Sequence, residues 1–328
     1  MSSSVEFGVL LPHFGSHADR ETLCNAAVLA EETGFDGLWA RDHLIYHPHG
    51  LEDPDQTFVE QFTTLSGMAT ITEEIALGTA VTIPLRHPLV LAQLYSSLSF
   101  MSERKIIAGI GLGNDEREFE GVNVPYDKRP EVHRETIDIL RKIWTEEDVS
   151  YDGDIYSFEE IEIFPQPVDE ISIWGGGSTP ASVRRSVEYC DGWLPGRIPL
   201  RTFEAAVNGL ERRADEQGRE TPESGAVPIV SVGDSKEEAL SKVDVDALLE
   251  SANGYKGEYW KKPESGRFET VEDIRGLLLA GTPAEIAADI EGYAEAGVDH
   301  LVFDLRLRFD DLEESIEILG DEVIPEFQ

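Results

Sequence analysis

The feature that most restricts the fold is an alternation of short apolar runs with amphipathic helical segments along all 328 residues. Eight runs have the length and composition of buried strands, and most precede a segment with helical spacing of apolar residues. Eight such units in a chain of this length predict an α/β fold, a (β/α)8 TIM barrel. A doubly wound sheet is the alternative, but it requires a boundary near the midpoint, and the composition shows none. The expected strands are Val5–Leu11, Gly37–Ala40, Ile75–Ile83, Ile106–Leu112, Ile171–Trp174, Gly192–Leu194, Val227–Val232 and Val298–Leu305.

We expect residues 1–328 to form a single domain. Two segments depart from the alternation. An exposed hairpin is expected at about 149–158, turning at Asp152-Gly153-Asp154. A segment without clear periodicity, at about 247–268 after the seventh strand, is interpreted as an insertion. The expected helices include Arg20–Thr33, Phe58–Ile71, His87–Met101, Pro130–Thr145, Val271–Leu279, Pro283–Ala296 and Leu312–Leu319.

The charge of the chain excludes several kinds of partner. It has 65 Asp and Glu against 27 Lys and Arg, a net charge of −38, which disfavours nucleic acid and anionic membranes. The acids are spread along the chain, which favours a surface adapted to concentrated salt over one acidic binding face. The sequence has no apolar run of roughly 20 residues and no secretory signal, so we expect a cytoplasmic protein. Two distant cysteines predict no disulfide framework.

Unusual residues cluster where the strands end, which is where barrel enzymes place their active sites. Among them, His43 is the candidate for acid–base chemistry, with a structurally satisfied histidine as the alternative reading. The candidate site residues are Asp42, His43, Thr79, Ala80, Val81, Gly109, Gly111, Asn114, Gly175, Gly176, Gly177, Ser178, Thr179, Gly196 and Arg197.

Two glycine patterns indicate ligand contacts. Gly109, Gly111 and Gly113 share one face of a strand, which leaves either a slot for a planar ligand or a place of close packing. The run Gly175–Thr179 precedes a helix expected to begin near Pro180, and its backbone N–H groups suit a phosphate. An ordinary capped loop is the alternative for that run. Arg184, Arg185 and Arg197 are the nearest candidates for local cations.

A metal site is not expected. His43, His47 and His49 lie on one loop with unspecific spacing, and no later group of His or Asp at strand ends completes a ligand set. A metal-dependent barrel hydrolase therefore remains only a remote alternative. His13, at the end of the first strand, lines the same mouth or serves a structural role.

Taken together, the motifs resemble the bacterial-luciferase-like superfamily, especially its branch that uses the 5-deazaflavin coenzyme F420. The resemblance covers most of the chain and depends on seven motifs in the same order. These are Phe35–His43, Leu77–Thr82 leading to Arg86-His87-Pro88, Gly109–Gly113, Arg134–Trp144, Trp174–Ser178 with Cys190–Pro195, Gly281–Glu285 and Ala296–Asp299.

The resemblance implies a flavin or deazaflavin at the barrel mouth, backed by a non-prolyl cis peptide in strand three, here Ala80–Val81. It implies that the Gly175–Thr179 loop holds the coenzyme phosphate, and that His43 lies near the reactive ring as proton donor or acceptor, beside Asp42. Hydride then passes between the ring and a small organic substrate. Relatives are commonly homodimers, and the acidic surface suggests a halophilic archaeon as the source.

Two departures from the family pattern bear on the substrate. Some sugar-phosphate dehydrogenases of this branch have a tryptophan where this chain has His47, and a glutamate where it has Asn114. This argues against glucose-6-phosphate and leaves a C1-carrying pterin, an alcohol or a carbonyl compound. The 247–268 insertion is expected to cover the site, with Tyr255, Tyr259 and Trp260 either facing substrate or packing locally. An FMN-dependent monooxygenase and a non-catalytic coenzyme-binding protein are the alternatives.

Overall fold

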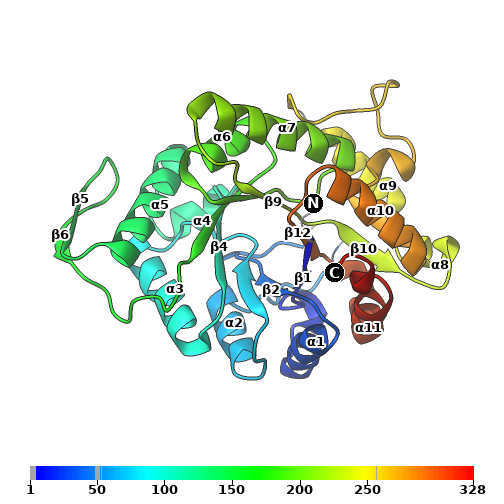
Figure 1. The fold of residues 1–328 in the computed structure, drawn as a ribbon, viewed down its shortest axis with the longest axis horizontal. Coiled ribbons are helices and arrows are strands. Elements are labelled where there is room, and N and C mark those ends of the chain that lie inside the picture. Colours follow the sequence, from blue (N-terminus) through cyan, green and yellow to red (C-terminus); the bar gives the residue numbers. More distant parts are fainter. Residues whose placement is uncertain (1–4, 49–51, 53, 256) are drawn as a thin grey trace.

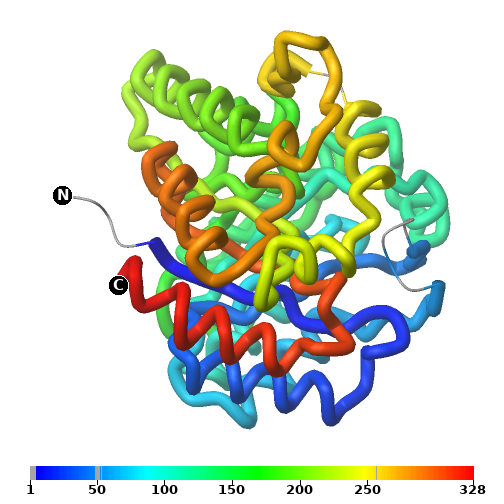
Figure 2. Tube along the Cα trace, turned by 90° about the vertical axis from the view of Figure 1, so that its right-hand side faces the viewer, coloured from blue at the N-terminus to red at the C-terminus, as the bar shows by residue number. Residues whose placement is uncertain are grey.

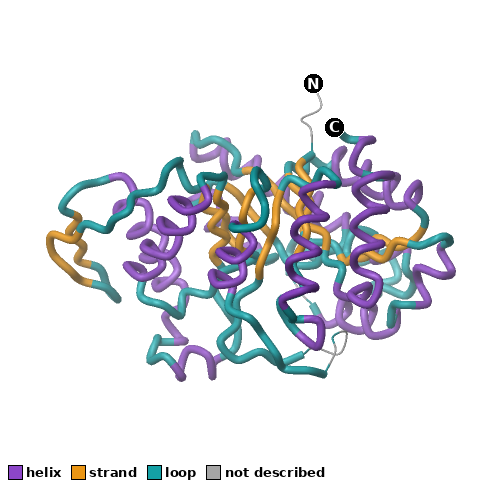
Figure 3. The backbone as a smooth tube through the Cα atoms, turned by 90° about the horizontal axis from the view of Figure 1, so that it is seen from below, coloured by secondary structure: helices purple, strands orange, loops and turns teal. Residues whose placement is uncertain are grey.

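The structure is a computed structural model that describes residues 5–48, 52, 54–255 and 257–328. Its centre is a closed barrel of eight parallel strands in the order β1-β12-β9-β8-β7-β4-β3-β2, which confirms the predicted fold class (Figure 1). In Figure 3 the barrel strands occupy the middle, with helices on either side of them. The barrel strands are β1 (Glu6–Leu10), β2 (Gly37–Ala40), β3 (Ala76–Thr79), β4 (Ile106–Ile110), β7 (Ser172–Gly176), β8 (Gly192–Leu194), β9 (Glu223–Ala226) and β12 (His300–Phe303).

The helices begin and end at residues that favour these boundaries. Asp19 caps the first helix, and Gly34, with φ of 86°, follows its end. Thr179 and Ser182 form a capping box at the helix after β7. Figure 2 shows the last helix running beside the first. The helices are α1 (Arg20–Glu32), α2 (Gln61–Ala69), α3 (Pro88–Ser102), α4 (Glu116–Gly121), α5 (Arg129–Thr145), α6 (Pro180–Tyr189), α7 (Leu200–Gln217), α8 (Lys236–Ser241), α9 (Val245–Gly254), α10 (Pro283–Glu295) and α11 (Leu312–Glu322). None of them is long and apolar enough to cross a membrane.

The seventh barrel strand lies earlier in the chain than the sequence predicted. The barrel uses β9, whereas the apolar run predicted as that strand forms β10 (Ile229–Val232), which pairs with β11 (Leu278–Gly281) in a separate two-stranded sheet. β9 has small residues because large ones do not fit: a Cβ on Gly225 would lie 2.7 Å from both Leu194 and Trp174. The strand therefore lacks the apolar run by which strands are recognised.

The region around the insertion also differs from its prediction. The expected helix Val271–Leu279 is wrong: a short 3-10 helix, Glu272–Ile274, is followed by Gly276 with φ of 91°, and the chain then enters β11. A residue in the left-handed region does not continue a right-handed helix. Within 247–268, α9 occupies the first part. Tyr259 is buried against Gly209 of α7. Trp260 is buried and packs locally, and its indole N–H donates to the Ala252 carbonyl.

An antiparallel hairpin, β5 (Val149–Asp152) and β6 (Ser157–Ile161), projects from the side of the barrel beyond α5 (Figure 1). Its turn is held by Glu135 of α5, whose buried carboxylate accepts the backbone N–H groups of Asp154, Ile155 and Tyr156. The hairpin is thus anchored to the barrel through α5 and lies away from the strand ends.

Large aromatic side chains fill the barrel interior. Trp39 and Trp174 are fully buried with ring centroids 6.0 Å apart, and His300 lies against both rings. The Trp39 indole nitrogen lies 3.2 Å from His300 Nε2. Glycines on neighbouring strands make room for these rings, for example Gly78, where an added Cβ would lie 2.5 Å from Trp39. These rings fill the barrel interior, and a cavity lies beyond them at the carboxyl ends of the strands.

Strand three ends in a bulge, and the side chain of Val81 in this bulge fills the expected ligand slot. The Ala80–Val81 peptide is cis, as the resemblance implied. An added Cβ on Gly109 would lie 2.0 Å from the Thr79 carbonyl oxygen and 3.0 Å from Val81, and one on Gly111 would lie 2.5 Å from Val81. The gap left by these glycines therefore holds Val81 and the strand-three backbone. The slot prediction is corrected to close packing.

Candidate active site

A cavity of about 170 Å³ opens among the carboxyl ends of the barrel strands. Ala80 and Val81 line it at β3, Gly177 after β7, and Gly196 and Arg197 after β8. The structure thus brings together five of the predicted site residues from three separate strand ends. Apolar surface from Leu10 and Leu194 and charged groups from two further strand ends complete the lining.

The charged part of the cavity is an ion-pair network around two arginines. Arg41 follows β2, and its Nη1 lies 3.0 Å from Glu52 Oε1. Arg306 follows β12, contacts the same Glu52 oxygen, and places Nη2 2.6 Å from Asp304 Oδ2. Burial raises the pKa of Asp304, but the charge and hydrogen bonds of Arg306 outweigh it, so the pKa is lowered. Asp304 is therefore ionised, and Glu52 pairs with both arginines.

Arg197 adds positive charge that the network does not balance. Its Nη1 is buried and has no hydrogen-bond partner among the described residues. The nearby Arg306 charge and burial lower the pKa of Arg197 to about 10, so it stays protonated at neutral pH. Three arginines face two carboxylates at a mouth in a protein of net charge −38. An unpaired buried guanidinium is the kind of group that an anionic ligand satisfies.

The glycine-rich loop after β7 lies beside this cavity. A second cavity of about 130 Å³, lined by Ser178, Arg197, Ser251 and Tyr255, adjoins the first at Gly196 and Arg197. The capping box uses the N–H groups of Thr179 and Ser182. Within the described part of the chain, the backbone N–H groups of Ser178 and Ala181 have no acceptor. The loop therefore presents free donors at a helix N-terminus next to Arg197.

Asp42 is engaged in a buried ion pair. Its side chain is 2 % exposed, and its two oxygens accept from Arg86 Nη1 at 2.8 Å and Nη2 at 3.1 Å. It also accepts the Ile83 backbone N–H at 3.0 Å. Arg86 in turn contacts Glu60, the N-cap of α2. These contacts give Asp42 a positioning role, in which it ties the end of β2 to the segment after the bulge.

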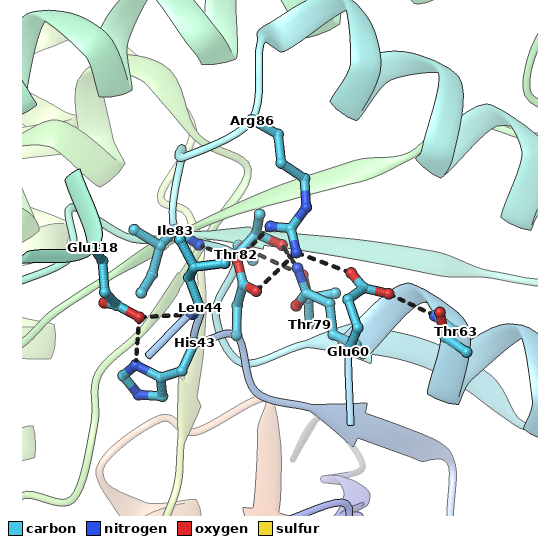
Figure 4. A network of polar contacts seen from close by, with 12 residues as sticks. His43, Leu44, Glu60, Thr63, Thr79, Thr82, Ile83, Arg86 and Glu118 are labelled. Atoms are coloured by element: carbon cyan, nitrogen blue, oxygen red, sulfur yellow. Dashed lines mark hydrogen bonds and ion pairs between the residues drawn. The ribbon is translucent and has the colours of Figure 1, made fainter. Parts of the chain in front are cut away.

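His43 points to the other side of the same loop. Its Nδ1 lies 3.4 Å from Oε1 of Glu118, which also accepts the Leu44 backbone N–H (Figure 4). The ring packs edge-on against Phe58 at 5.6 Å, and 22 % of the side chain is exposed. His43 is therefore held through Nδ1 and partly exposed, although it is not among the lining residues of either cavity.

His13 has a structural role. It is fully buried, its Nδ1 lies 2.8 Å from the Val59 carbonyl, and its Nε2 accepts the Arg41 backbone N–H at 2.9 Å. Burial lowers the pKa of His13 to about 3, so the ring is neutral. His13 thereby fixes Arg41, although it does not line the cavity.

The other predicted residues support the site from outside the cavities. Thr79 is buried and hydrogen-bonds Tyr95 Oη at 2.8 Å. Gly175 faces Ser186 of α6, and Gly176 packs against Val81. Asn114 is exposed after β4, where its carbonyl accepts from Tyr126.

Sequence reasoning missed Arg41, Arg306 and Glu118. Basic residues are scarce in this chain, and Arg41 directly follows β2 while Arg306 lies three residues after β12, a signal that identifies both. Glu118 gave no such signal, because glutamate is common here. Of the three arginines proposed as local cations, only Arg197 lines the cavity, and Arg184 instead lies 3.9 Å from Glu188 on α6.

The described residues contain no group of three or more His, Cys, Asp or Glu that could hold a metal ion. His49, one member of the alternative metal set, lies outside the described residues. The described geometry offers no metal-ligand set around His43, whose ring nitrogen instead faces a buried carboxylate.

The profile of the luciferase-like monooxygenase family matches residues 5–300. The chain belongs to this family. An F420-dependent glucose-6-phosphate dehydrogenase of Nakamurella multipartita is 26% identical over 316 residues, covering 92% of this chain and 91% of that protein. A 5,10-methylenetetrahydromethanopterin reductase of Archaeoglobus fulgidus is 26% identical over 329 residues, covering 92% and 94%.

The same fold occurs in a solved F420-dependent secondary alcohol dehydrogenase in complex with an F420–acetone adduct. It superposes on this family member with a TM-score of 0.80 at 19% identity, covering 99% of each chain. At this identity the likeness concerns the fold. It agrees with the closed barrel and extends over its surrounding helices.

The neutral, buried His13 makes the stability of the protein depend on pH. The unfolded chain binds a proton at this histidine below its ordinary pKa of 6.5, whereas the folded protein does so only near 3. Stability is therefore fully present above pH 6.5 and falls as pH drops toward 3, by up to about 1.4 kcal/mol per pH unit. We expect His13→Gln to flatten this dependence between pH 6 and 4. Urea unfolding of both proteins across this range checks it, and equal slopes would contradict the expectation.

Proposed function

We propose that this protein is an F420-dependent oxidoreductase that transfers hydride between the deazaflavin and a small organic substrate. The observation that carries the proposal is the cavity between Ala80–Val81 and Arg197. It offers a backbone platform and an arginine whose buried Nη1 has no hydrogen-bond partner among the described residues. Both curated relatives described above cover more than nine-tenths of the chain, and one is named as F420-dependent.

The residues present fit such a coenzyme. Ala80 and Val81 offer the surface for a planar ring, with Thr79, Gly109, Gly111 and Gly176 holding that surface from behind. The loop Gly175–Thr179 would hold the phosphate, because Ser178, whose N–H has no acceptor among the described residues, lines one cavity with Gly196 and Arg197. Asn114 remains a proposed contact from the end of β4. The coenzyme supplies the carbon that accepts or donates hydride.

The chain itself supplies binding, orientation and proton transfer. His43 donates or accepts the proton that accompanies hydride transfer, through its accessible ring edge. Asp42, held by Arg86, fixes the loop from which His43 projects. Arg41 and Arg306 are paired with Glu52 and Asp304, so Arg197 supplies the excess positive charge that favours an anionic coenzyme against the field of the acidic surface.

The substrate class within this reaction type is a C1-carrying pterin, an alcohol or a carbonyl compound. His47 and Asn114 stand where some sugar-phosphate dehydrogenases of the branch have tryptophan and glutamate, which argues against glucose-6-phosphate. The second candidate function is an FMN-dependent monooxygenase, which membership in the luciferase-like monooxygenase family favours.

Coenzyme binding tests this proposal. We expect the purified protein, in molar KCl, to bind F420 and to bleach it with at least one alcohol or C1-pterin. Arg197→Gln should weaken F420 binding by roughly 10- to 100-fold, the effect of losing a hydrogen bond to a charged group. Arg184→Gln is the matched control, since its side chain lies on α6 and pairs with Glu188.

Three outcomes contradict the proposal in different ways. Tight FMN binding without F420 binding favours the monooxygenase. F420 binding without bleaching by any candidate substrate favours a non-catalytic coenzyme-binding protein. Equal F420 affinity of the two arginine variants removes Arg197 from the coenzyme site.

We also propose that the protein is a homodimer formed through α3. This helix has no charged residue in a chain that is 28% charged, and Val90, Phe100 and Met101 are 47%, 53% and 75% exposed on it. Burying such a face is favourable at about 25 cal/mol per Å² of apolar surface. A second copy of the chain offers the same uncharged surface.

Light scattering after gel filtration tests the dimer. We expect twice the 36.4 kDa chain mass for the natural protein and a monomer for Val90→Glu/Met101→Glu. The control Asn208→Glu, on an exposed position of α7, should stay dimeric. A monomeric natural protein, or a dimeric double variant, would contradict this interface.

We further propose that the acidic surface adapts the protein to the salty cytoplasm of a halophilic archaeon. The net charge of −38 repels itself at low ionic strength, and molar salt shortens the Debye length to about 3 Å. The free energy of unfolding should therefore fall as KCl is reduced from molar to about 0.1 M. A protein equally stable in both would argue against salt adaptation.

A further inference from the structure

We propose that Glu118 is a positioning residue for His43: its carboxylate holds the Nδ1 proton of the imidazole, so that Nε2 is the nitrogen that exchanges a proton with substrate. This inference rests on the proposed hydride transfer at the mouth. It adds a residue 75 positions away in the chain that the sequence did not single out.

Glu118 concentrates its contacts on one oxygen. Oε1 accepts the Leu44 N–H at 2.7 Å and the Ile45 N–H at 3.0 Å, and His43 Nδ1 lies 3.4 Å away (Figure 4). Oε2 is buried and has no partner among the described residues. The side chain is fully buried, so the carboxylate belongs to the packed base of the loop.

The carboxylate is ionised in spite of its burial. Burial raises the pKa of Glu118, but the contact with His43 and the two backbone N–H groups outweigh it, so the pKa is lowered. The ionised carboxylate binds the two backbone N–H groups more strongly than a neutral oxygen would. The same oxygen faces the imidazole, where it accepts the Nδ1–H and so orients the ring.

The surroundings of His43 leave Glu118 as its charged partner. Phe58 and Tyr46 lie against the ring at 5.6 and 6.2 Å between centroids. His13, on β1's side of the mouth, is neutral because burial lowers its pKa. Asp42, the adjacent residue, is occupied by Arg86. Nε2 of His43 has no hydrogen-bond partner within the described ranges, and the side chain is partly exposed.

The fold fixes Glu118 firmly enough to orient another side chain. Asp115 caps α4, and Phe119, the neighbour of Glu118, is fully buried in a small cluster with Ile83 and Leu85. This cluster joins α4 to the segment just after the strand-three bulge. The contact with His43 is thus built on packing, as an orienting residue requires.

The proton balance of the step is simple. When an alcohol is oxidised, its C–H bond breaks and the electron pair leaves as hydride to the oxidised coenzyme. The O–H proton goes to His43 Nε2, and a C=O bond forms. The resulting imidazolium keeps its second N–H on Glu118. In the reducing direction the same Nε2 returns the proton to the carbonyl oxygen.

Nitrogen NMR of the coenzyme-free protein labelled with [15N]histidine tests the inference without any substrate. The His43 signals are identified by their loss in His43→Asn. We expect Nδ1 to carry the proton and Nε2 to be bare in the neutral ring. Glu118→Gln should lower the share of this tautomer, while Glu116→Gln, which removes an exposed charge from the same helix, should not.

The nitrogen NMR spectrum of the natural protein tests the predicted His43 tautomer even if Glu118→Gln does not fold. A proton on Nε2 of neutral His43 would overturn the inference, as would an unchanged tautomer in a folded Glu118→Gln protein. In the reaction with F420, Glu118→Gln should slow coenzyme bleaching roughly tenfold or more and leave the F420 affinity unchanged. A loss of this size is a part of the rate that general acid–base catalysis contributes. Absence of bleaching by the natural protein counts against the proposed function and leaves the tautomer result standing.

Discussion

The mouth of the barrel depends on how Val81 packs. Gly109, Gly111 and Gly176 leave space on three sides of its side chain, and any Cβ there would collide with it or with the backbone beside it. With Val81 in this space, the chain leaves β3 early and then hydrogen-bonds β4 again through Thr82. Ala80 and Val81 thereby face the cavity. The segment that follows reaches the Asp42 carboxylate and the packing cluster beneath α4.

The charged groups of the same mouth form two sets. In the cavity, three arginines (Arg41, Arg197 and Arg306) outnumber their two carboxylate partners. Outside the cavity, two buried carboxylates each hold a loop in place, Asp42 by binding Arg86 and Glu118 by accepting backbone N–H groups. A strongly acidic protein thus places its charges for opposite purposes: exposed acids cover the surface, while buried acids build a site that favours an anion.

The sequence predicted the barrel, seven of its eight strands and the cis peptide, because each of these depends on local periodicity or on a motif. It failed at β9, whose residues are small because Trp174 and Leu194 occupy the space above Gly225. It also failed in the interpretation of Gly109 and Gly111, because glycine alone does not reveal whether a ligand or a side chain fills the gap. Arg41 and Arg306 were missed for a related reason: their importance comes from meeting at one cavity.

By itself the sequence determined the order of strands and helices, and therefore which residues lie at the carboxyl ends of the strands. This information is local, since the periodic pattern of apolar side chains that marks a strand or a helix involves only neighbouring residues. The tertiary structure decided which distant side chains meet there. Glu118 reaches His43 across 75 residues, and Arg306 reaches Glu52 across 254. Such contacts depend on barrel closure, strand register and packing, which fix side chains in space only when the whole chain is folded.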